Sequence, residues 1–397
     1  MRVLICCNQI PFPLKDGYSM ACMQIIKGLK SLQVTIDVLA YNTSKKPKKE
    51  NDFKEFEKEA NQWHFIDVDN HISYLGATKA LLSGKNYNLS RFQTTQIKKK
   101  LEEILKTNNY DIIQLEGLYL APIIPTLRIH SKAKIIYRSH NIEYLIWERI
   151  TKSEANYIKK AYLKILSKQI QRLEKQCWRD VDNILSISKV DLKHIKKFDK
   201  SISINYLPYG VDQFQSSSII PNKHLYFIGS MDWLPNLVGM EWFIKDIWPS
   251  ISKKFPSLEL HIAGRNIPNV FYKHQKERLY IHGEIESAKE FMNEYGIMLV
   301  PLKSGSGVRI KIIEGLANSK CILSTRIGAE GLFEKGNAHI LIADTLEEFE
   351  QQIDKCINLK DTLPKIMQEA NLYAKMRHDN SKICNQLLSH YETLLLT

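Results

Sequence analysis

The chain has 397 residues, and because a single hydrophobic core rarely grows beyond ~250–300 residues, the sequence predicts two domains. Its hydrophobic content of 44% and charged content of 25% are ordinary values for a globular protein. The net charge of +13 favours an acidic partner, such as nucleic acid, an anionic membrane surface or a phosphorylated substrate; a lysine-rich solvated surface is the alternative.

The cysteines and the apolar runs bear on the cellular compartment. The seven cysteines form no C-x-x-C pair and no metal-ligand spacing, and several lie inside apolar strand patterns, as reduced core cysteines do. The N-terminal segment MRVLICCNQIPFP predicts a strand and not a signal peptide, because its short apolar run ends in polar residues and prolines. No apolar segment approaches the ~18–20 residues that span a bilayer. We therefore expect a cytoplasmic protein, with any membrane association peripheral and at the inner face.

The first half of the chain predicts alternating strands and helices. A buried strand at 3–7, a helix that Ser19 caps and that runs to about Leu32, and a strand at 35–41 form a βαβ unit, for which a parallel sheet is the default. The glycine fingerprint G-x-G-x-x-G is absent from its first turn, which argues against a dinucleotide cofactor. Further strands are expected at 63–68, 111–115, 134–139, 183–188 and 203–207, and helices at 94–106, at 118–129 and along the lysine-rich tract 144–179.

The second half repeats this architecture after a hinge. The segment LPYGVD at 207–212 carries proline and glycine, which is typical of a hinge. Strands are then expected at 225–228, 258–263, 279–282, 297–302, 321–325 and 339–342, and helices at 237–255, at 287–295, around Glu314 and from 346 onward. The expected fold class is α/β, with two doubly wound domains at 1–206 and 207–377.

The segment 301–325 contains the strongest binding signal. It predicts a strand end, a helix start and, between them, a small-residue loop whose backbone N–H groups can approach an anion closely: Ser304, Gly305, Ser306 and Gly307. Arg309 and Lys311 add two cations where the helix dipole prefers anions, and Glu314 can accept hydrogen bonds from vicinal hydroxyls. The pattern predicts a diphosphate and ribose site. The alternative is an ordinary helix in which Lys311 and Glu314 form an i,i+3 ion pair.

Polar residues also follow other strands. His140 and Asn141 lie just beyond the strand at 134–139, at the rim where open α/β sheets bind ligands. Glu116 and Tyr119 lie on another strand-end loop and either face an acceptor or have a structural role. In the second half, Asn236 is expected to cap the helix that begins at 237.

The order of several motifs resembles a known family. LPYGVD, YFIGSMDWLPN, HIAGR, IHGEI and SGSGVRIKIIEGLANSKCILSTRIGAEGL together resemble the donor half of group 1 glycosyltransferases with the GT-B fold. YNLSRF, QLEGLYLAP and RSHNIEYLIWERI resemble the acceptor half in the bacterial surface-polysaccharide branch of that family. The resemblance implies two Rossmann-like domains facing each other across a cleft. The N-terminal one would bind the acceptor, the C-terminal one the nucleotide sugar, and a helix at about 378–397 would pack back on the first.

The resemblance also implies a reaction. A sugar would pass from a nucleotide-diphosphate sugar to an acceptor hydroxyl with retention of configuration, in cell-surface polysaccharide or glycolipid biosynthesis, with no metal or cofactor required. The acceptor would be a saccharide or lipid-linked saccharide, and the lysine-rich tract would meet an anionic membrane surface. We expect no nucleic-acid partner, because no zinc finger, recognition-helix pattern or aromatic RNA-binding signature is present. The rival hypotheses are a nucleotide-sugar epimerase on the same fold and a non-catalytic binder of polyanions.

The resemblance assigns roles to individual residues. Glu314 matches the family glutamate that holds the nucleotide ribose, whereas Ser306 stands where the family has a glutamate that contacts the donor sugar. Arg309 and Lys311 are expected to replace the diphosphate-binding Arg and Lys of the family, which are absent from GSMDWLPN. His140 matches the family histidine beside the transferred sugar.

The remaining expected contacts lie at strand ends. On the donor side they are Gly229, Ser230, Arg265 and Gly283, with Gly305 and Gly307 in the loop. Asp16-Gly17 matches the glycine loop near the donor phosphates, with one glycine where the family commonly has two. Glu116 and Asn141 complete the acceptor side.

Overall fold

The computed structural model describes residues 1–14, 16–44, 47, 54–69, 71, 95–215, 222–275, 278–305, 307–333, 339–359 and 362–396. The chain forms two compact units, and the first of them is discontinuous in sequence. It comprises Met1–Gly210 together with Asn380–Thr397, whereas the second comprises Val211–Asp379. The boundaries expected from the sequence were 206/207 and 377/378. The motif YNLSRF, at 87–92, lies outside the described residues.

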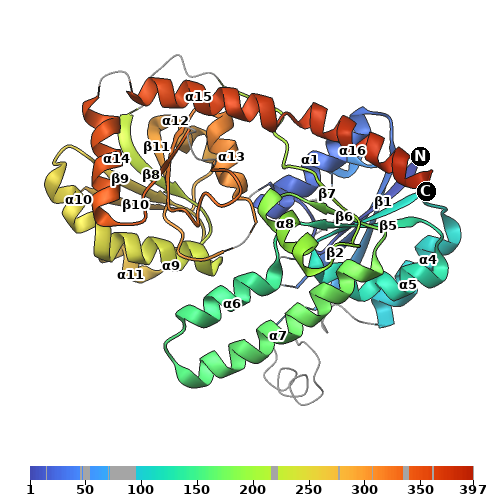
Figure 1. The fold of residues 1–397 in the computed structure, drawn as a ribbon. Helices are drawn as coiled ribbons and strands as arrows, with labels where there is room; N and C mark the ends of the chain where they lie inside the picture. Colours follow the sequence, from blue (N-terminus) through green and yellow to red (C-terminus); the bar gives the residue numbers. More distant parts are fainter. Residues whose placement is uncertain are drawn as a thin grey trace. The chain divides into compact units, whose positions relative to one another are not determined.

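The first unit is built on a parallel seven-stranded sheet in the order β3-β2-β1-β4-β5-β6-β7 (Figure 1). The chain therefore winds outward from β1 in one direction and from β4 in the other, which confirms the doubly wound prediction for this half. Its strands are β1 (Arg2–Cys7), β2 (Thr35–Thr43), β3 (Gln62–Val68), β4 (Ile112–Glu116), β5 (Lys134–Ser139), β6 (Asn183–Ser186) and β7 (Ile204–Tyr206).

Helices cover both faces of this sheet. Alternate strand residues point to opposite faces, so Leu4 and Cys6 pack in one core while Val3 and Ile5 pack in the other. The first core contains residues of α4 (Thr95–Thr107), α5 (Ile124–His130), α7 (Tyr157–Asp180) and α8 (Lys189–Phe198). The second contains residues of α1 (Gly17–Ser31) and α16 (Asn380–Leu395). The unit also contains η2 (Glu57–Glu59), η3 (Leu118–Ile123) and α6 (Glu143–Ser153).

One helix cap predicted in this unit was wrong. Ser19 does not cap α1; Asp16 is the N-cap, and its side chain accepts a hydrogen bond from the Ser19 backbone N–H at 2.9 Å. The helical tract at 144–179 consists of two helices. It breaks at residues 154–156, where Asn156 caps α7 by accepting from the Lys159 backbone N–H.

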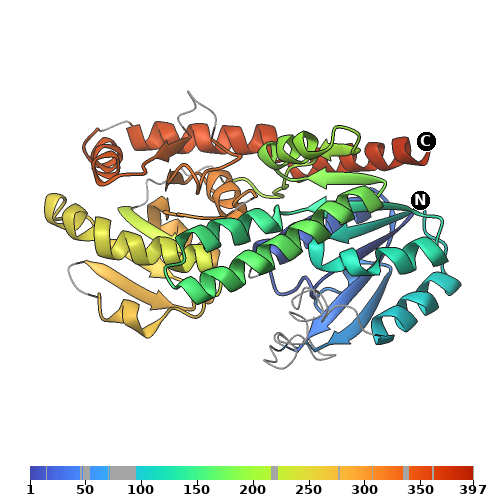
Figure 2. The same cartoon turned by 60° about the horizontal axis from the view of Figure 1, so that its bottom comes forward.

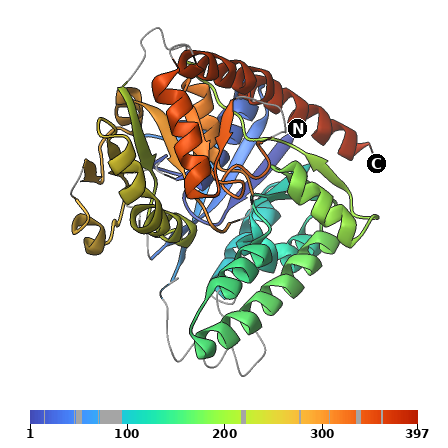
Figure 3. The same ribbon diagram turned by 60° about the vertical axis from the view of Figure 1, so that its left-hand side comes forward.

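The second unit repeats the topology with a parallel six-stranded sheet in the order β10-β9-β8-β11-β12-β13 (Figure 3). Its strands are β8 (Asn222–Ile228), β9 (Leu260–Ala263), β10 (Leu279–Gly283), β11 (Tyr295–Val300), β12 (Cys321–Ser324) and β13 (Ile340–Ile342). The order reverses between β8 and β11, as it does between β1 and β4, so the second half is also doubly wound, as predicted.

The helices of the second unit are α9 (Leu234–Trp242), the π-helix η4 (Phe243–Ile247), α10 (Trp248–Lys254), α11 (Asn269–Tyr272), α12 (Ala288–Glu294), α13 (Ile310–Ala317), α14 (Leu346–Asn358) and α15 (Thr362–Arg377). The helix predicted at 237–255 begins earlier, at Leu234, because Pro235 fits the first turn of a helix. Asn236 is consequently inside the helix, and the prediction that it is a cap was wrong.

The state of the cysteines and the hydropathy of the helices were also predicted from the sequence. All seven cysteines lie within the described ranges as buried thiols. None of the described helices combines the length and the hydropathy that crossing a bilayer requires. Figure 2 gives a second view of the layered arrangement of strands and helices in each unit.

Candidate functional site

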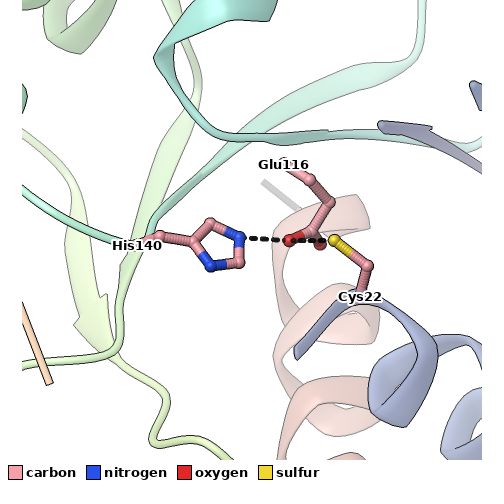
Figure 4. Close-up of side chains that lie close together, drawn as sticks. All are labelled: Cys22, Glu116 and His140. Atoms are coloured by element: carbon pink, nitrogen blue, oxygen red, sulfur yellow. Dashed lines mark hydrogen bonds and ion pairs between the residues drawn. The ribbon is translucent and has the colours of Figure 1, made fainter. Parts of the chain in front are cut away.

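The first cluster of polar side chains lies at the carboxyl edge of the first sheet. Glu116 is the last residue of β4, and His140 directly follows β5, its neighbour in the sheet. Parallel strands end at the same edge, so these side chains meet, and α1 adds Cys22 (Figure 4). His140 Nε2 lies 2.6 Å from Glu116 Oε2, and the Cys22 thiol donates to the same oxygen at 3.7 Å.

The Glu116 carboxylate is fully buried and electrically compensated. Arg138, 1% exposed and paired with Glu116 in strand register, places its Nη1 3.3 Å from Oε2, and Gln114 donates to Oε1 at 2.6 Å. Burial alone would raise the pKa of the Glu116 carboxyl. The Arg138 charge and the hydrogen bonds from His140 and Gln114 outweigh it and lower that pKa to about 2. Glu116 is therefore ionised at neutral pH.

His140 is held in one tautomer by this carboxylate. Burial lowers the pKa of the imidazole below its ordinary value, although the hydrogen bond with Glu116 opposes the shift, so the ring is neutral at pH 7. Since an ionised carboxylate only accepts, Nε2–H must donate to Glu116, and Nδ1 carries the lone pair. The ring packs 5.2 Å from the Tyr18 ring, whose hydroxyl donates to the Glu116 backbone carbonyl at 3.0 Å.

Cys22, Glu116 and His140 are also the kinds of ligand that could hold a metal ion, with ligand atoms within 4.8 Å of one another. The charge balance does not favour such an ion. Arg138 already neutralises the carboxylate, and burial keeps the pKa of the Cys22 thiol well above its ordinary value. We therefore describe the cluster as a hydrogen-bonded network rather than a metal centre.

Other predicted residues of this half lie at the same edge with local roles. Asp16 caps α1, of which Gly17 is the first residue, and Gln9 Nε2 lies 3.4 Å from the Asp16 carboxylate oxygens. The Asn141 carbonyl accepts from the Ser139 hydroxyl at 3.0 Å. The structure thus brings Glu116 and His140 into direct contact. It gives Asp16 a capping role that the Asp-Gly-x-Ser pattern could have predicted.

The second cluster lies at the carboxyl edge of the second sheet, where glycines line the rim. Gly229 follows β8, Gly264 follows β9 and Gly283 ends β10. Their backbones run side by side, with the Gly229 N–H donating to the Ala263 carbonyl at 3.1 Å and the Gly264 N–H to the Gly283 carbonyl at 2.8 Å. A side chain on Gly264, whose φ is +150°, would collide with the Gly229 carbonyl. Gly264 is a rim residue that the site predictions missed, although it stands in the HIAGR motif.

Lys311 carries a half-buried cation at this rim. From the first turn of α13 its Nζ donates to Asn236 Oδ1 at 3.0 Å and lies 4.2 Å from the centre of the Phe227 ring. Burial, and then the nearby Arg309 charge, lower the pKa of Lys311 to about 7. Within the described ranges, no carboxylate lies within ion-pair distance of this ammonium group.

Asn236 joins Lys311 to the loop after β8. Its Nδ2 donates to the Ser230 carbonyl at 2.8 Å, while its Oδ1 accepts from Lys311. A Cβ added to Gly229 would lie 2.9 Å from Asn236 Nδ2 and 3.4 Å from Lys311 Nζ, so glycine there leaves room for this pair. Asn236 is therefore part of this rim, although the sequence pattern predicts it to be a helix cap.

Arg309 holds the loop before α13. It is the N-cap residue, 5% exposed, and its Nη1 donates to the Gly307 carbonyl at 2.8 Å while the guanidinium lies 5.4 Å from the centre of the Trp233 ring. Gly305, with φ +131°, packs against the same guanidinium, and a side chain there would collide with it. The described contacts of Arg309 thus support the glycine loop.

The remaining predicted donor residues occupy the same unit. Glu314 is half-buried on α13, one turn after Lys311, and Ser230 donates to the Asp232 carboxylate at 3.1 Å. The Arg265 carbonyl accepts from the Met231 N–H at 2.9 Å, which ties the loops after β8 and β9 together. Ser306 lies outside the described residues.

Residues 222–358 match the model of a family described as glycosyl transferases group 1. A curated relative, an uncharacterized 44.6 kDa protein in the cps region of Klebsiella pneumoniae, is 22% identical, and the match covers 97% of this chain and 98% of the relative.

Solved structures resemble the whole chain. Sucrose-phosphate synthase from Thermosynechococcus elongatus superposes with a TM-score of 0.75 at 11% identity, over 100% of both chains. HepE from Anabaena, solved in complex with UDP-glucose, gives a TM-score of 0.69 at 13% identity, over 98% of this chain and 99% of that one. At such identities the likeness concerns the fold. The chain therefore has the expected GT-B fold, and its residues 222–358 match the group 1 glycosyltransferase model.

Proposed function

We propose that this protein is a retaining glycosyltransferase that moves a sugar from a nucleotide-diphosphate sugar to an acceptor hydroxyl. The observation that carries the proposal is Lys311, a half-buried cation with neutral partners at the glycine-lined rim of a region that matches the group 1 glycosyltransferase model. A desolvated ammonium without a carboxylate partner is unfavourable in a protein alone. It becomes favourable when a diphosphate supplies the opposite charge.

The geometry around Lys311 supports a role in stabilising the leaving group. Because Gly229 has no side chain, its backbone can lie close to Lys311 Nζ. The hydrogen bond to Asn236 fixes the direction of the ammonium group. As the bond from the sugar to the diphosphate breaks, its electron pair stays on the diphosphate. Lys311 and the N–H groups at the start of α13 would absorb that charge. Glu314, one turn further along the same helix, is proposed to accept hydrogen bonds from the nucleotide ribose.

In the first unit, His140 is proposed to contact the transferred sugar. Glu116 holds Nε2–H, so Nδ1 is an acceptor for a sugar hydroxyl. Glu116 itself is a poor covalent nucleophile, because it is buried and bonded to Arg138, Gln114 and His140. Retention would then follow from attack on the face that the diphosphate leaves. The acceptor oxygen forms the new bond to the sugar carbon, and its proton passes to a phosphate oxygen. No metal is required for this step.

The relatives suggest which pathway and donors to test. A relative in a cps region supports a role in cell-surface polysaccharide biosynthesis, with a saccharide or lipid-linked saccharide as acceptor. HepE was solved with UDP-glucose, which makes uridine diphosphate sugars the first donors to examine.

The test is a panel of nucleotide sugars measured first by thermal stabilisation and then by transfer. A ligand at a hundredfold excess over its dissociation constant stabilises the folded protein by ~2.7 kcal/mol, which is readily seen as a rise in Tm. With a saccharide acceptor, the new linkage should keep the anomeric configuration of the donor, as read by proton NMR.

Two outcomes would contradict the proposal. Conversion of a nucleotide sugar in the absence of acceptor would indicate an epimerase, and an inverted linkage would exclude retention. Glu314→Ala should abolish nucleotide stabilisation without unfolding the protein. Glu369→Ala, a half-buried glutamate on α15 of the same unit, is the matched control and should leave that stabilisation intact.

A further inference from the structure

The long helix α7 has two apolar faces, of which only one is covered. Buried side chains including Leu163, Leu166, Ile170 and Trp178 pack into the core of the first unit. On the opposite side lies a second row at the spacing i, i+4, i+7. It consists of Ile158, Tyr162 and Ile165, whose exposed fractions are 85%, 40% and 47%. Single exposed apolar residues are common, but a row of them on one helix face marks an interaction surface.

Cations border this outward row. Lys164, Lys168 and Arg172 are exposed on α7, whereas Lys159, near its start, forms an ion pair with Glu154 at 2.6 Å. From residue 155 to residue 173 the sequence contains no aspartate or glutamate. The lysine-rich helix α4 is different, since Lys98 and Lys100 form ion pairs there with Glu102 and Glu103. Helix α4 thus carries lysines that are partly compensated by its own glutamates. The outward face of α7 combines apolar side chains with Lys164, Lys168 and Arg172, for which the described residues provide no ion-pair partner.

The start of α7 lies at the end of a helical hairpin. Helices α6 and α7 lie side by side and antiparallel, and the turn at residues 154–156 is at the end of the hairpin remote from the sheet of the first unit (Figures 1 and 3). Tyr157 and Ile158, 87% and 85% exposed, occupy the first turn after this tip. The apolar row therefore begins where the hairpin projects furthest from its own sheet.

We propose that the outward face of α7, formed by Tyr157, Ile158, Tyr162 and Ile165 with the bordering lysines, binds an anionic lipid bilayer. The isoleucine and tyrosine side chains enter the boundary between headgroups and acyl chains, and the lysines contact lipid phosphates. A second copy of this chain would bring the same positive charge against itself, and nucleic acid would leave the isoleucines uncovered. The charge and the apolar row together fit lipid.

The test is co-sedimentation of the full chain with vesicles in the absence of any nucleotide sugar, which keeps it independent of the proposed reaction. Vesicles of phosphatidylcholine containing phosphatidylglycerol should bind the protein, and vesicles of phosphatidylcholine alone should bind it at least about tenfold more weakly. Raising the salt concentration should weaken the binding.

Two pairs of variants separate the apolar from the cationic contribution. Ile158→Ser/Ile165→Ser should weaken binding to the anionic vesicles about tenfold, whereas Ile129→Ser/Leu372→Ser, at exposed positions on α5 and α15, should not. Lys164→Glu/Lys168→Glu should weaken it by a similar factor. Lys99→Glu/Lys106→Glu on α4 makes the same change in net charge and should have a much smaller effect.

The proposal is wrong if the wild type and all four variants bind anionic vesicles equally well. It is also wrong if the wild-type protein does not bind anionic vesicles. Sedimentation velocity tests the alternative that a second copy of this chain covers the face. If Ile158→Ser/Ile165→Ser converts a dimer to a monomer and leaves vesicle binding unchanged, the face belongs to a second copy. Unchanged transfer to a soluble acceptor by the α7 variants, with unchanged circular dichroism, supports the assignment to lipid alone.

Discussion

The two units place opposite charges at the same position of the same topology. In the first, the buried anion Glu116 lies at the carboxyl edge where the strand order reverses between β1 and β4, and Arg138 and His140 compensate it. In the second, the half-buried cation Lys311 lies at the reversal between β8 and β11, and its partners are the Asn236 amide and the Phe227 ring.

This difference separates two uses of a charge at the carboxyl edge of a sheet. A charge that the protein compensates internally organises the site around it, as Glu116 orients His140. A charge whose described partners are neutral is available to a ligand of opposite sign, and it costs stability until that ligand binds. Substitutions at the two rims should therefore have opposite effects on the stability of the nucleotide-free protein.

The largest effect on stability is expected from Glu116→Gln. It leaves the Arg138 guanidinium buried without its carboxylate, so the free energy of unfolding should fall by about 3–5 kcal/mol. Urea denaturation measures the change. Glu102→Gln is the control, because Glu102 is partly exposed beside Lys98 and His130 and should cost less than about 1 kcal/mol. Equal effects of the two substitutions would show that Glu116 is not a compensated buried charge.

Lys311→Met should act in the opposite sense. Removing a desolvated cation while keeping an apolar stem should leave the thermal stability of the nucleotide-free protein unchanged or higher. The transfer rate should fall about 10²–10³-fold, the cost of losing one donor to developing negative charge. Lys320→Met is the matched control. Lys320 is 2% exposed, and burial lowers its pKa to about 8, but it lies at the amino end of β12. Its loss should leave turnover intact.

The pH dependence of donor binding should sharpen the contrast. Because the pKa of Lys311 is about 7 in the nucleotide-free protein, the ammonium form becomes scarce above that pH, while a bound diphosphate favours it. Affinity for UDP should fall by up to about tenfold per pH unit above pH 7. Calorimetry between pH 7 and 9 measures this slope, and Lys311→Arg should flatten it. A flat profile in the wild type would mean that Lys311 does not contact the diphosphate.

The same pKa gives a signed prediction for stability. The folded-state pKa of Lys311 lies below its ordinary value of 10.5, so the unfolded chain binds more protons between about pH 7 and 10.5. Wild-type stability should therefore rise with pH across this window relative to Lys311→Met. Thermal unfolding of the two proteins at pH 7 and pH 9.5 provides the comparison, and parallel curves would contradict it.

The smallest effect is expected from Tyr391→Phe. The Tyr391 hydroxyl on α16 donates to Gln114, which in turn donates to Glu116. Losing this hydrogen bond should cost about 1 kcal/mol of unfolding free energy. Tyr162→Phe, at an exposed position on α7, should change stability by less than about 0.5 kcal/mol. A larger change at Tyr162 than at Tyr391 would indicate that the network around Glu116 does not depend on α16.

The fold could be predicted from the sequence because its strands are buried apolar runs bounded by strong breakers. The contacts of the site could not. Asn236 and Lys311 are 75 positions apart, and their hydrogen bond depends on how α9 and α13 pack against the sheet. The pairing of Glu116 with Arg138 depends on strand register, which hydrophobic pattern alone does not specify in strands buried on both faces.

Two local signals were nevertheless present in the sequence and were assigned differently. Pro235 is suited to the first turn of a helix, which places the start of α9 before Asn236 rather than after it. Asp16, three residues before Ser19, has the spacing of a cap whose carboxylate accepts from the backbone N–H of the third helical residue. In both cases the actual cap residue lies three positions before the polar residue expected to form it.

The return of α16 to the first unit has a consequence for synthesis on the ribosome. The second unit, Val211–Asp379, is one continuous stretch and can complete its core as soon as it has emerged. The first unit cannot, although most of it is made earlier, because Leu387 and Tyr391 complete one of its two cores. At about 5–20 residues per second, the face that α16 will cover stays open throughout translation of the second unit. The domain that starts first is therefore the last to finish folding.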